Sequence, residues 1–506
     1  MSLLINKQLW NTCASLAAGT LTVLAFSPYD YFLIPFFTLG LLFYQFRSSR
    51  TSMQAFSSGY FFGLGLFGAG VNWLHISINL FGGVSLTGAI LITLALILFL
   101  SLYPAISGWI VFRYRKCQTS IMLMLVMPAA WTLMEWCRSW IFTGFPWLNI
   151  GYTQTDSPMS GMAPILGVYG VGWLTAMTAG LFCLVTIGRK REKILAAIAL
   201  LCVWMFALQS QQTEWTTPGE RSLTTAVIQG GIEQQVKWLP EQRQKSIDTY
   251  MKMTEPYWGH DLILWPETAL PMFYHQAGEI IAEIRSLSRQ HDSHLVSGIA
   301  FMDPDSGRYY NSLILFGEID DMYHKRHLVP FGEYLPFDKY LRPILGFLDI
   351  PMSSFSRGKQ ENPVLVVSGE VIGVSICYED VFGEEIIDAM PQAGMLANVS
   401  NDAWFGNSLA PHQHLQMARM RAMETGRYMI RATNTGISAI IDQKGKILDQ
   451  LPQFGAHALS ARVVPFEGST PYSKTGNLFI IGLMIAILGL CMSRHKHNAD
   501  EKPAEQ

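Results

Sequence analysis

A cysteine at the end of an apolar run is the residue of this chain best suited to nucleophilic chemistry. Cys377 follows the run Val371–Ile376, which only Gly373 and Ser375 interrupt, and it precedes the polar segment Tyr378–Asp380. An apolar, β-branched run that stops at acidic residues is typical of a buried strand that opens into a turn. Reacting groups are often presented at such strand ends, because the strand is rigid and the turn is reachable.

The number of cysteines leaves two interpretations of Cys377 open. The chain has 7 cysteines, and all the others lie before residue 211 or after residue 475. A lone cysteine is either a buried, inert thiol or a working nucleophile, and a structural thiol in an oxidising compartment normally has a disulfide partner. A nucleophilic thiol also needs a base and an oxyanion donor. Glu267, Lys325 and Glu333 are the candidates, although a carboxylate at a strand end is usually a cap and a loop lysine is usually solvated.

The apolar composition indicates a membrane protein that carries one globular domain. Half of the 506 residues are hydrophobic and 15% are charged, whereas a soluble protein has about a quarter charged residues. The deficit of charge falls on residues 1–210 and 476–506, and residues 211–475 have the mixed composition of a domain with its own core. The net charge of −2 gives no sign of nucleic-acid binding.

Eight apolar segments predict about eight membrane-spanning helices. A helix that crosses the hydrocarbon core needs about 20 mostly apolar residues, so the shorter segments must extend by a few residues. Lys and Arg cluster in every second connection, which favours the cytoplasmic side for those connections. Both termini are therefore expected in the cytoplasm and residues 211–475 on the outer side. The segments are Trp10–Phe26, Tyr31–Tyr44, Ala55–Ile76, Thr87–Phe112, Ile121–Trp136, Ala163–Ile187, Ile194–Leu208 and Leu478–Met492.

Strand and helix patterns alternate within residues 211–475, which implies a layered α/β domain. The chain thus divides into a bundle of seven transmembrane helices (1–210), an outward-facing domain (211–475) and a final helix with a cytoplasmic tail (476–506). The predicted strands are Ser222–Gln229, Asp261–Trp265, Leu295–Ala300, Ser312–Phe316, Val371–Ile376, Met395–Val399, Ile437–Ile441 and Lys446–Leu448. The predicted helices are Glu241–Tyr257, Ala277–Gln290 and His412–Arg427.

Three motifs in the middle domain resemble the nitrilase superfamily. They are Trp265–Glu267, Lys325–Glu333 and Ile376–Glu379. The resemblance implies an αββα sandwich and a Glu-Lys-Cys triad. In this triad Glu267 is the general base, Cys377 is the nucleophile and Lys325 stabilises the oxyanion.

Combined with the apolar segments, these motifs resemble the apolipoprotein N-acyltransferase family, a membrane-embedded branch of that superfamily. Three further stretches share the likeness: Thr143–Trp147, Phe355–Gly358 and Ser400–Gly406. The resemblance implies that Cys377 takes an acyl chain from a phospholipid, with phosphatidylethanolamine as the expected donor, and holds it as a thioester. The acyl chain then passes to the α-amino group of the N-terminal diacylglyceryl-cysteine of an apolipoprotein. It also implies the bacterial inner membrane, a periplasmic catalytic domain and no cofactor.

The same resemblance suggests supporting residues. The backbone N–H of Tyr378 is a possible second oxyanion donor, Glu333 would orient Lys325 or the substrate amine, and Glu379 would support the site. The segment Leu328–Met352 is rich in apolar residues, and we expect it to dip toward lipid or to cover the acyl pocket. Trp238 either lies near the entrance of the site or packs at the start of a helix. The candidates for substrate or lid contacts are Trp238, Trp147, Phe347, Leu348 and Trp404.

Two other classes of function stay open. A nitrilase-type amidase tethered to the membrane would share the triad, although one helix would suffice for tethering. A transporter with an outward binding domain would carry ionisable residues or broken helices at mid-membrane, whereas Glu135 and Arg138 lie at the end of a segment and are spaced to pair there. No metal site is expected, because His412 and His414 do not share a helix face.

Overall fold

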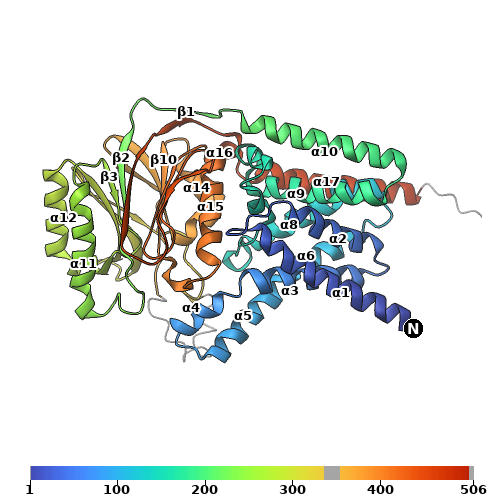
Figure 1. Cartoon of the computed structure of the whole chain (residues 1–506), viewed down its shortest axis with the longest axis horizontal. Coiled ribbons are helices and arrows are strands. Elements are labelled where there is room, and N and C mark those ends of the chain that lie inside the picture. The colour runs from blue at the N-terminus through green and yellow to red at the C-terminus, as the bar shows by residue number, and fades with distance from the viewer. Residues whose placement is uncertain (1, 336–353, 501–506) are drawn as a thin grey trace, which may run out of the picture. The chain divides into compact units, whose positions relative to one another are not determined.

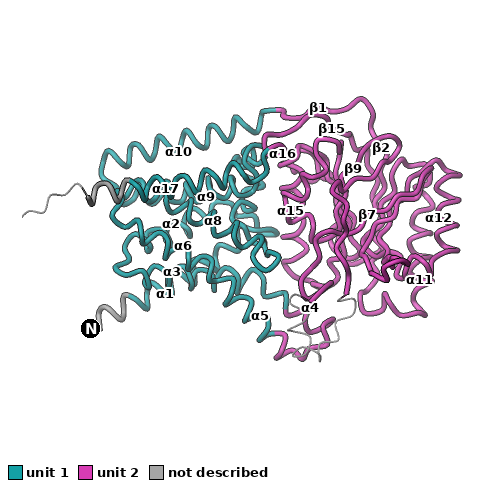
Figure 2. Tube along the Cα trace, turned by 180° about the vertical axis from the view of Figure 1, so that it is seen from behind, with its two compact units in different colours: residues 1–74, 90–213, 475–506 teal, residues 75–89, 214–474 magenta. Residues whose placement is uncertain are grey.

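The structure of the chain is a computed structural model that describes residues 2–335 and 354–500. The chain forms two compact units, which Figure 2 colours separately. Unit 1 comprises residues 1–74, 90–213 and 475–506, and unit 2 comprises residues 75–89 and 214–474. Phe347 and Leu348, the two predicted lid residues, lie outside the described residues.

Helices build unit 1, and small residues allow them to approach closely. A Cβ on Gly65 of α3 would overlap the carbonyl oxygen of Leu16, and a Cβ on Gly19 of α1 would overlap that of Phe62. Such contacts are typical of membrane helices, because lipid tails supply no hydrophobic drive for helix association. The main helices are α1 (Ser2–Thr22), α2 (Ile34–Ser48), α3 (Ser52–Gly70), α5 (Leu86–Leu100), α6 (Leu102–Phe112), α8 (Met127–Arg138), α9 (Ala163–Ile187), α10 (Lys190–Gln211) and α17 (Leu478–Asp500).

The predicted membrane-spanning helices are confirmed in part. Each of the eight predicted segments contains helix, but four helical stretches in the described ranges are long and apolar enough to cross a membrane. A fifth is added if α3 and α4 (Leu74–Leu80), bent by 54° at their break, form one span. Helix α2 has 15 residues, which gives about 22 Å against a hydrocarbon core of about 30 Å. The four stretches are Leu86–Phe112, Thr119–Arg138, Pro158–Ile187 and Lys190–Gln211.

Two β-sheets form the centre of unit 2. The first has the strand order β14-β2-β3-β5-β6-β7 with β4 beside β5, and the second has the order β13-β12-β11-β10-β9-β8. Strands β2, β3 and β5 run parallel, as do β9, β10 and β11. The first sheet contains β2 (Leu223–Gln229), β3 (Leu262–Leu264), β4 (Leu270–Phe273), β5 (His294–Met302), β6 (Tyr309–Phe316), β7 (Asp321–His324) and β14 (His457–Val463). The second contains β8 (Val364–Val367), β9 (Glu370–Ile376), β10 (Met395–Ser400), β11 (Met429–Thr433), β12 (Ala439–Ile441) and β13 (Ile447–Gln450).

The two sheets enclose an apolar core and carry helices on their outer faces (Figure 1). Val227 and Leu313 of the first sheet and Val374 and Ile430 of the second contribute to this core. Helices α11 and α12 cover the first sheet, and α14 and α15 cover the second. This arrangement is the αββα sandwich that the family resemblance implied. The helices are α11 (Pro240–Thr254), α12 (Gly278–Gln290), α14 (Gly383–Ile386) and α15 (Ala410–Thr425).

The local sequence explains most of these elements. Ile281 and Ile284 of α12 are spaced i, i+3 and are both buried, so one face of the helix packs toward the sheet. The eight predicted strands are confirmed as β2, β3, β5, β6, β9, β10, β12 and β13. Strand β11 was missed because it carries Arg431 in an otherwise apolar run. The edge strand β14 was missed because five of its seven residues are not buried and its alternation is weak.

Candidate active site

A left-handed turn presents Cys377 at the carboxyl end of β9. The φ angle of Cys377 is 52°, a conformation that costs a non-glycine residue roughly 1–3 kcal/mol and that is common at functional sites. The buried carboxylate of Glu379 holds this turn, because its Oε2 accepts the N–H of Ile376 at 2.7 Å. Its Oε1 accepts the hydroxyl of Tyr323 at 2.8 Å and the N–H of Arg326 at 2.6 Å. Glu379 therefore ties the turn of Cys377 to the end of β7.

Lys325 directly follows β7, and its ammonium is buried between two carboxylates. Its Nζ lies 2.9 Å from Glu333 Oε2, 3.0 Å from Glu333 Oε1 and 3.7 Å from Glu267 Oε1. Burial by itself lowers the pKa of Lys325, but the charges of Glu333 and Glu267 outweigh it and hold that pKa above its usual value. The ammonium is therefore a fixed positive charge, which is what stabilisation of an oxyanion requires.

The side-chain amide of Asn311 bridges the carboxylates of Glu267 and Glu333. Its Nδ2 donates to Glu267 Oε1 at 2.7 Å and to Glu333 Oε1 at 2.8 Å. Sequence reasoning did not single out Asn311, which lies in the apolar strand β6. The sequence did contain a signal for Asn311. An amide within a predicted buried strand needs hydrogen-bond partners inside the protein. Asn311 and Lys325 together set the distance between the two carboxylates.

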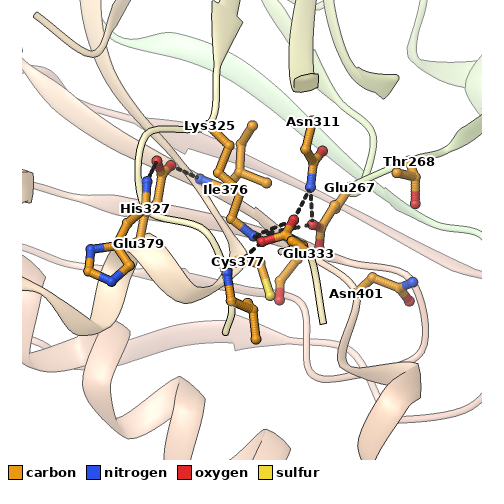
Figure 3. A network of polar contacts seen from close by, with 12 residues as sticks. Glu267, Thr268, Asn311, Lys325, His327, Glu333, Ile376, Cys377, Glu379 and Asn401 are labelled. Atoms are coloured by element: carbon orange, nitrogen blue, oxygen red, sulfur yellow. Dashed lines mark hydrogen bonds and ion pairs between the residues drawn. The ribbon is translucent and has the colours of Figure 1, made fainter. Parts of the chain in front are cut away.

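The thiol of Cys377 belongs to this group of charges, because the charges of Glu267 and Lys325 both act on it (Figure 3). Burial and the charge of Glu267 raise the pKa of Cys377 well above its usual value, whereas Lys325 works in the opposite direction. The resting thiol is therefore protonated. A protonated thiol would need a base in order to act as a nucleophile, and Glu267 is close enough for its charge to act on this thiol.

The stretch Phe355–Gly358, one of the three further stretches that share the family likeness, contacts two of these residues. The N–H of Phe355 donates to the carbonyl of Glu333 at 2.9 Å, and the N–H of Gly358 donates to that of Lys325 at 2.8 Å. Two residues of the pocket are thus held by backbone bonds from one segment, which limits their movement.

Two family models match most of the chain. The apolipoprotein N-acyltransferase N-terminal domain matches residues 18–181, and the carbon-nitrogen hydrolase model matches residues 224–466. An apolipoprotein N-acyltransferase of Methylococcus capsulatus is 41% identical over 493 residues, which cover 97% of this chain and 98% of the relative. A protein of the same name from Vibrio cholerae is 38% identical over 490 residues, which cover 94% and 95%. The chain belongs to the apolipoprotein N-acyltransferase family. It is an acyltransferase.

Among solved structures, Nit3 of Saccharomyces cerevisiae, a member of branch 10 of the nitrilase superfamily, is 18% identical. The match covers 48% of this chain and 91% of Nit3, with a TM-score of 0.38. The nitrilase-like fold of this acyltransferase is assigned from the carbon-nitrogen hydrolase match and from the two sheets of unit 2.

An aromatic cluster adjoins the charged pocket of this N-acyltransferase family member, and Trp238 belongs to it. Tyr309 lies two residues before Asn311 on β6, and Tyr334 directly follows Glu333. Phe355, another member of the cluster, donates its N–H to the carbonyl of Glu333, so the cluster adjoins this residue. The cluster consists of Trp238, Phe273, Tyr309, Tyr334 and Phe355, with Ala300 and Leu328 beneath.

The other predicted residues lie at different places. The ring of Trp404 lies 4.9 Å from that of Phe81 within unit 2. Trp147 is buried in unit 1, 5.3 Å from the ring of Trp73, and its relation to Cys377 stays a prediction. The side chain of Tyr378 packs edge-on against Phe382, with ring centroids 5.2 Å apart.

The charges of Glu135 and Arg138 act on each other, as their spacing suggested, but both residues are buried and bond to the following loop. Glu135 Oε1 accepts the N–H of Ile150 at 2.8 Å. Arg138 donates to the carbonyls of Phe145 and Trp147 and to Asn149 Oδ1. The pair thus holds the loop that carries Trp147.

A buried network of four charged residues lies behind the turn of Cys377, and the sequence did not reveal it. His414 contacts Asp380 at 2.7 Å and Asp402 at 2.9 Å, and Arg431 contacts the same carboxylates at 2.8 and 3.2 Å. Burial and Arg431 lower the pKa of His414, but Asp380 and Asp402 outweigh both and raise it to about 9. The two positive and two negative charges therefore balance within the network. In the described part of the chain no group of His, Cys, Asp and Glu is arranged to hold a metal ion.

Proposed function

We propose that this protein transfers an acyl chain from a phospholipid to the N-terminal diacylglyceryl-cysteine of apolipoproteins through a thioester on Cys377. The observation that supports the proposal most is a buried ammonium, Lys325, held between Glu267 and Glu333 beside a protonated thiol. Nucleophile, base and oxyanion stabiliser are thereby close together.

In the first step, Glu267 accepts the thiol proton and the sulfur of Cys377 attacks the ester carbonyl of the phospholipid. The negative charge that develops on the carbonyl oxygen faces Lys325, and the backbone N–H of Tyr378 is the proposed second donor. The C–O bond of the ester then breaks. Glu267 returns its proton to the departing lysophospholipid oxygen, and a thioester on Cys377 remains.

In the second step, the α-amino group of the acceptor attacks the thioester carbonyl. The amine must be neutral, and free α-amino groups have a pKa of about 8. Glu267 takes the proton that the amine loses as the C–N bond forms, and the C–S bond breaks to release the thiolate of Cys377, which regains that proton. The thioester conserves the reactivity of the acyl group, so the transfer needs no further energy source.

We propose that the aromatic cluster that includes Trp238 receives the acyl chain. The cluster supplies apolar side chains and contacts Glu333 through the backbone of Phe355. In the proposed arrangement residues 1–210 and 476–506 form eight spans in the bacterial inner membrane, and both termini are cytoplasmic. Residues 211–475 then face the periplasm. Both substrates, phosphatidylethanolamine and the acceptor, are held in the bilayer beside this domain.

The test is an intact-mass measurement on the purified protein after incubation with phosphatidylethanolamine and no acceptor, with Cys377→Ala as the matched control. A gain of one fatty-acyl unit that hydroxylamine removes and that the variant lacks supports the proposal. Addition of a diacylglyceryl-cysteine peptide should then discharge the adduct and leave the acyl chain on the peptide.

Two outcomes contradict the proposal. Release of ammonia from small amides without an acyl adduct would favour a tethered amidase. The absence of both an adduct and amide hydrolysis would remove the catalytic interpretation of Cys377 and leave a transporter with a binding domain.

A further inference from the structure

A second buried lysine, Lys237, lies next to the proposed base. Lys237 precedes α11 and is 1% exposed. Its Nζ donates to Thr268 Oγ1 at 2.8 Å and to the backbone carbonyl of Glu267 at 3.2 Å. Both of these acceptors are uncharged, so the ammonium binds the backbone of Glu267 and the hydroxyl of Thr268.

A lysine in this position is unfavourable for the stability of the fold. Burial lowers the pKa of Lys237 to about 7, and the charge of Glu267 only partly offsets this effect. An apolar side chain of similar size usually stabilises a buried position at least as well as a charged one. Packing by itself therefore does not account for an ammonium at this site.

The turn that Lys237 contacts is strained and tightly held. Thr268 adopts a φ of 50°, which is rare for a β-branched residue. Gly298 also lies against this turn, because a Cβ at this position would overlap the backbone nitrogen of Thr268 and approach the Cα of Glu267. The backbone of Glu267 is thus contacted both by the strand β5, which contains Gly298, and by the ammonium of Lys237.

This confinement fixes where the carboxylate of Glu267 points. Glu267 Oε1 must lie 2.7 Å from Asn311 Nδ2 and 3.7 Å from Lys325 Nζ at the same time. A rotation of the Glu267–Thr268 peptide would move the Cα of Glu267 and break this geometry. Displacement of a catalytic group by about 1 Å can cost 100-fold in rate.

We propose that Lys237 is a positioning residue that clamps the Glu267–Thr268 peptide and thereby directs the carboxylate of Glu267 at the thiol of Cys377. The inference rests on the proposed role of Glu267 as the base. Lys237 acts through Glu267 and does not itself touch the substrate.

The test compares Lys237→Met with Lys245→Met, a control on the exposed side of α11, in single-turnover acylation by phosphatidylethanolamine. For Lys237→Met we expect acylation at saturating lipid to slow by about 100-fold, a KM that is little changed, and a Tm that is not lowered. Lys245→Met should match the wild type in rate, KM and Tm.

Substitutions at Thr268 test the same contact from its other side. Thr268→Ser keeps the hydroxyl and should react at the wild-type rate. Thr268→Val removes the hydrogen bond from Lys237 and should slow acylation by about 10-fold. The double variant Lys237→Met with Thr268→Val should be no slower than Lys237→Met, because both changes remove one interaction.

The outcomes separate this inference from the proposed function. If the wild type forms no thioester, the proposed function fails. If the wild type forms the thioester and Lys237→Met reacts equally fast, the clamp is refuted and the proposed function stands. A rate loss that follows a fall in Tm, or additive effects of the two substitutions, would assign Lys237 a merely structural role and also refute the clamp.

Discussion

Removal of the ammonium of Lys325 should affect stability and rate separately. In Lys325→Met the carboxylates of Glu267 and Glu333 lose contacts of 3.7 and 2.9 Å. At an effective dielectric constant of about 20, each contact supplies roughly 5 kcal/mol of attraction before desolvation is counted. Breaking a buried ion pair from one side typically costs about 3–5 kcal/mol, because a buried charge is left uncompensated. The free energy of unfolding should fall by that amount.

The loss of rate has a different cause and a different size. An oxyanion donor contributes roughly 3–4 kcal/mol to transition-state stabilisation, which corresponds to about 100- to 1,000-fold in the rate of thioester formation. Urea unfolding measures the loss of stability. The intact-mass assay with phosphatidylethanolamine measures the loss in the rate of thioester formation.

A second substitution distinguishes the two effects. Glu333→Gln removes one of the two negative charges, so the double variant Lys325→Met with Glu333→Gln should regain much of the lost stability. It should not regain the rate, because no positive charge faces the developing oxyanion. If the double variant forms the thioester at the wild-type rate, Lys325 has only a structural role and the assignment of the oxyanion donor is wrong.

Four further predictions concern Glu267, Asn311, Arg431 and His414. Glu267→Gln should speed alkylation of Cys377 by iodoacetamide at pH 8, since the charge of Glu267 raises the pKa of the thiol. The same substitution should abolish acylation. Slower alkylation would contradict the effect of Glu267 on the thiol. Asn311→Leu removes two hydrogen bonds to carboxylates and should slow acylation by about 100-fold, and an unchanged rate would show that Asn311 does not position the base. Arg431→Met should lower the free energy of unfolding by about 3–5 kcal/mol, as measured in urea. His414 has a folded pKa raised from 6.5 to about 9, so its contribution to stability is complete below pH 6.5 and is lost as the pH rises through 9; stability that increases over that interval would refute the network.

Local sequence patterns were sufficient to predict the two strands whose ends carry the proposed base and nucleophile. Asp261–Trp265 and Val371–Ile376 are short apolar runs that stop at polar residues, and both were recognised as strands. The parallel order of β2, β3 and β5 and of β9, β10 and β11 then places carboxyl ends together. The length of the membrane helices was less predictable, because the ends of a helix depend on its caps and neighbours.

The sequence by itself determined the apolar segments, the α/β alternation and the residue types of the Glu-Lys-Cys motif, because hydrophobic period and strand ends are local properties. Only the tertiary structure decided that Asn311 joins two carboxylates, that Lys237 contacts the backbone of Glu267, and that His414 and Arg431 neutralise two buried aspartates. These contacts join residues 12 to 51 positions apart. Strand register sets the distances in these contacts, and burial sets the strength of each charge interaction. No local sequence pattern records either of them.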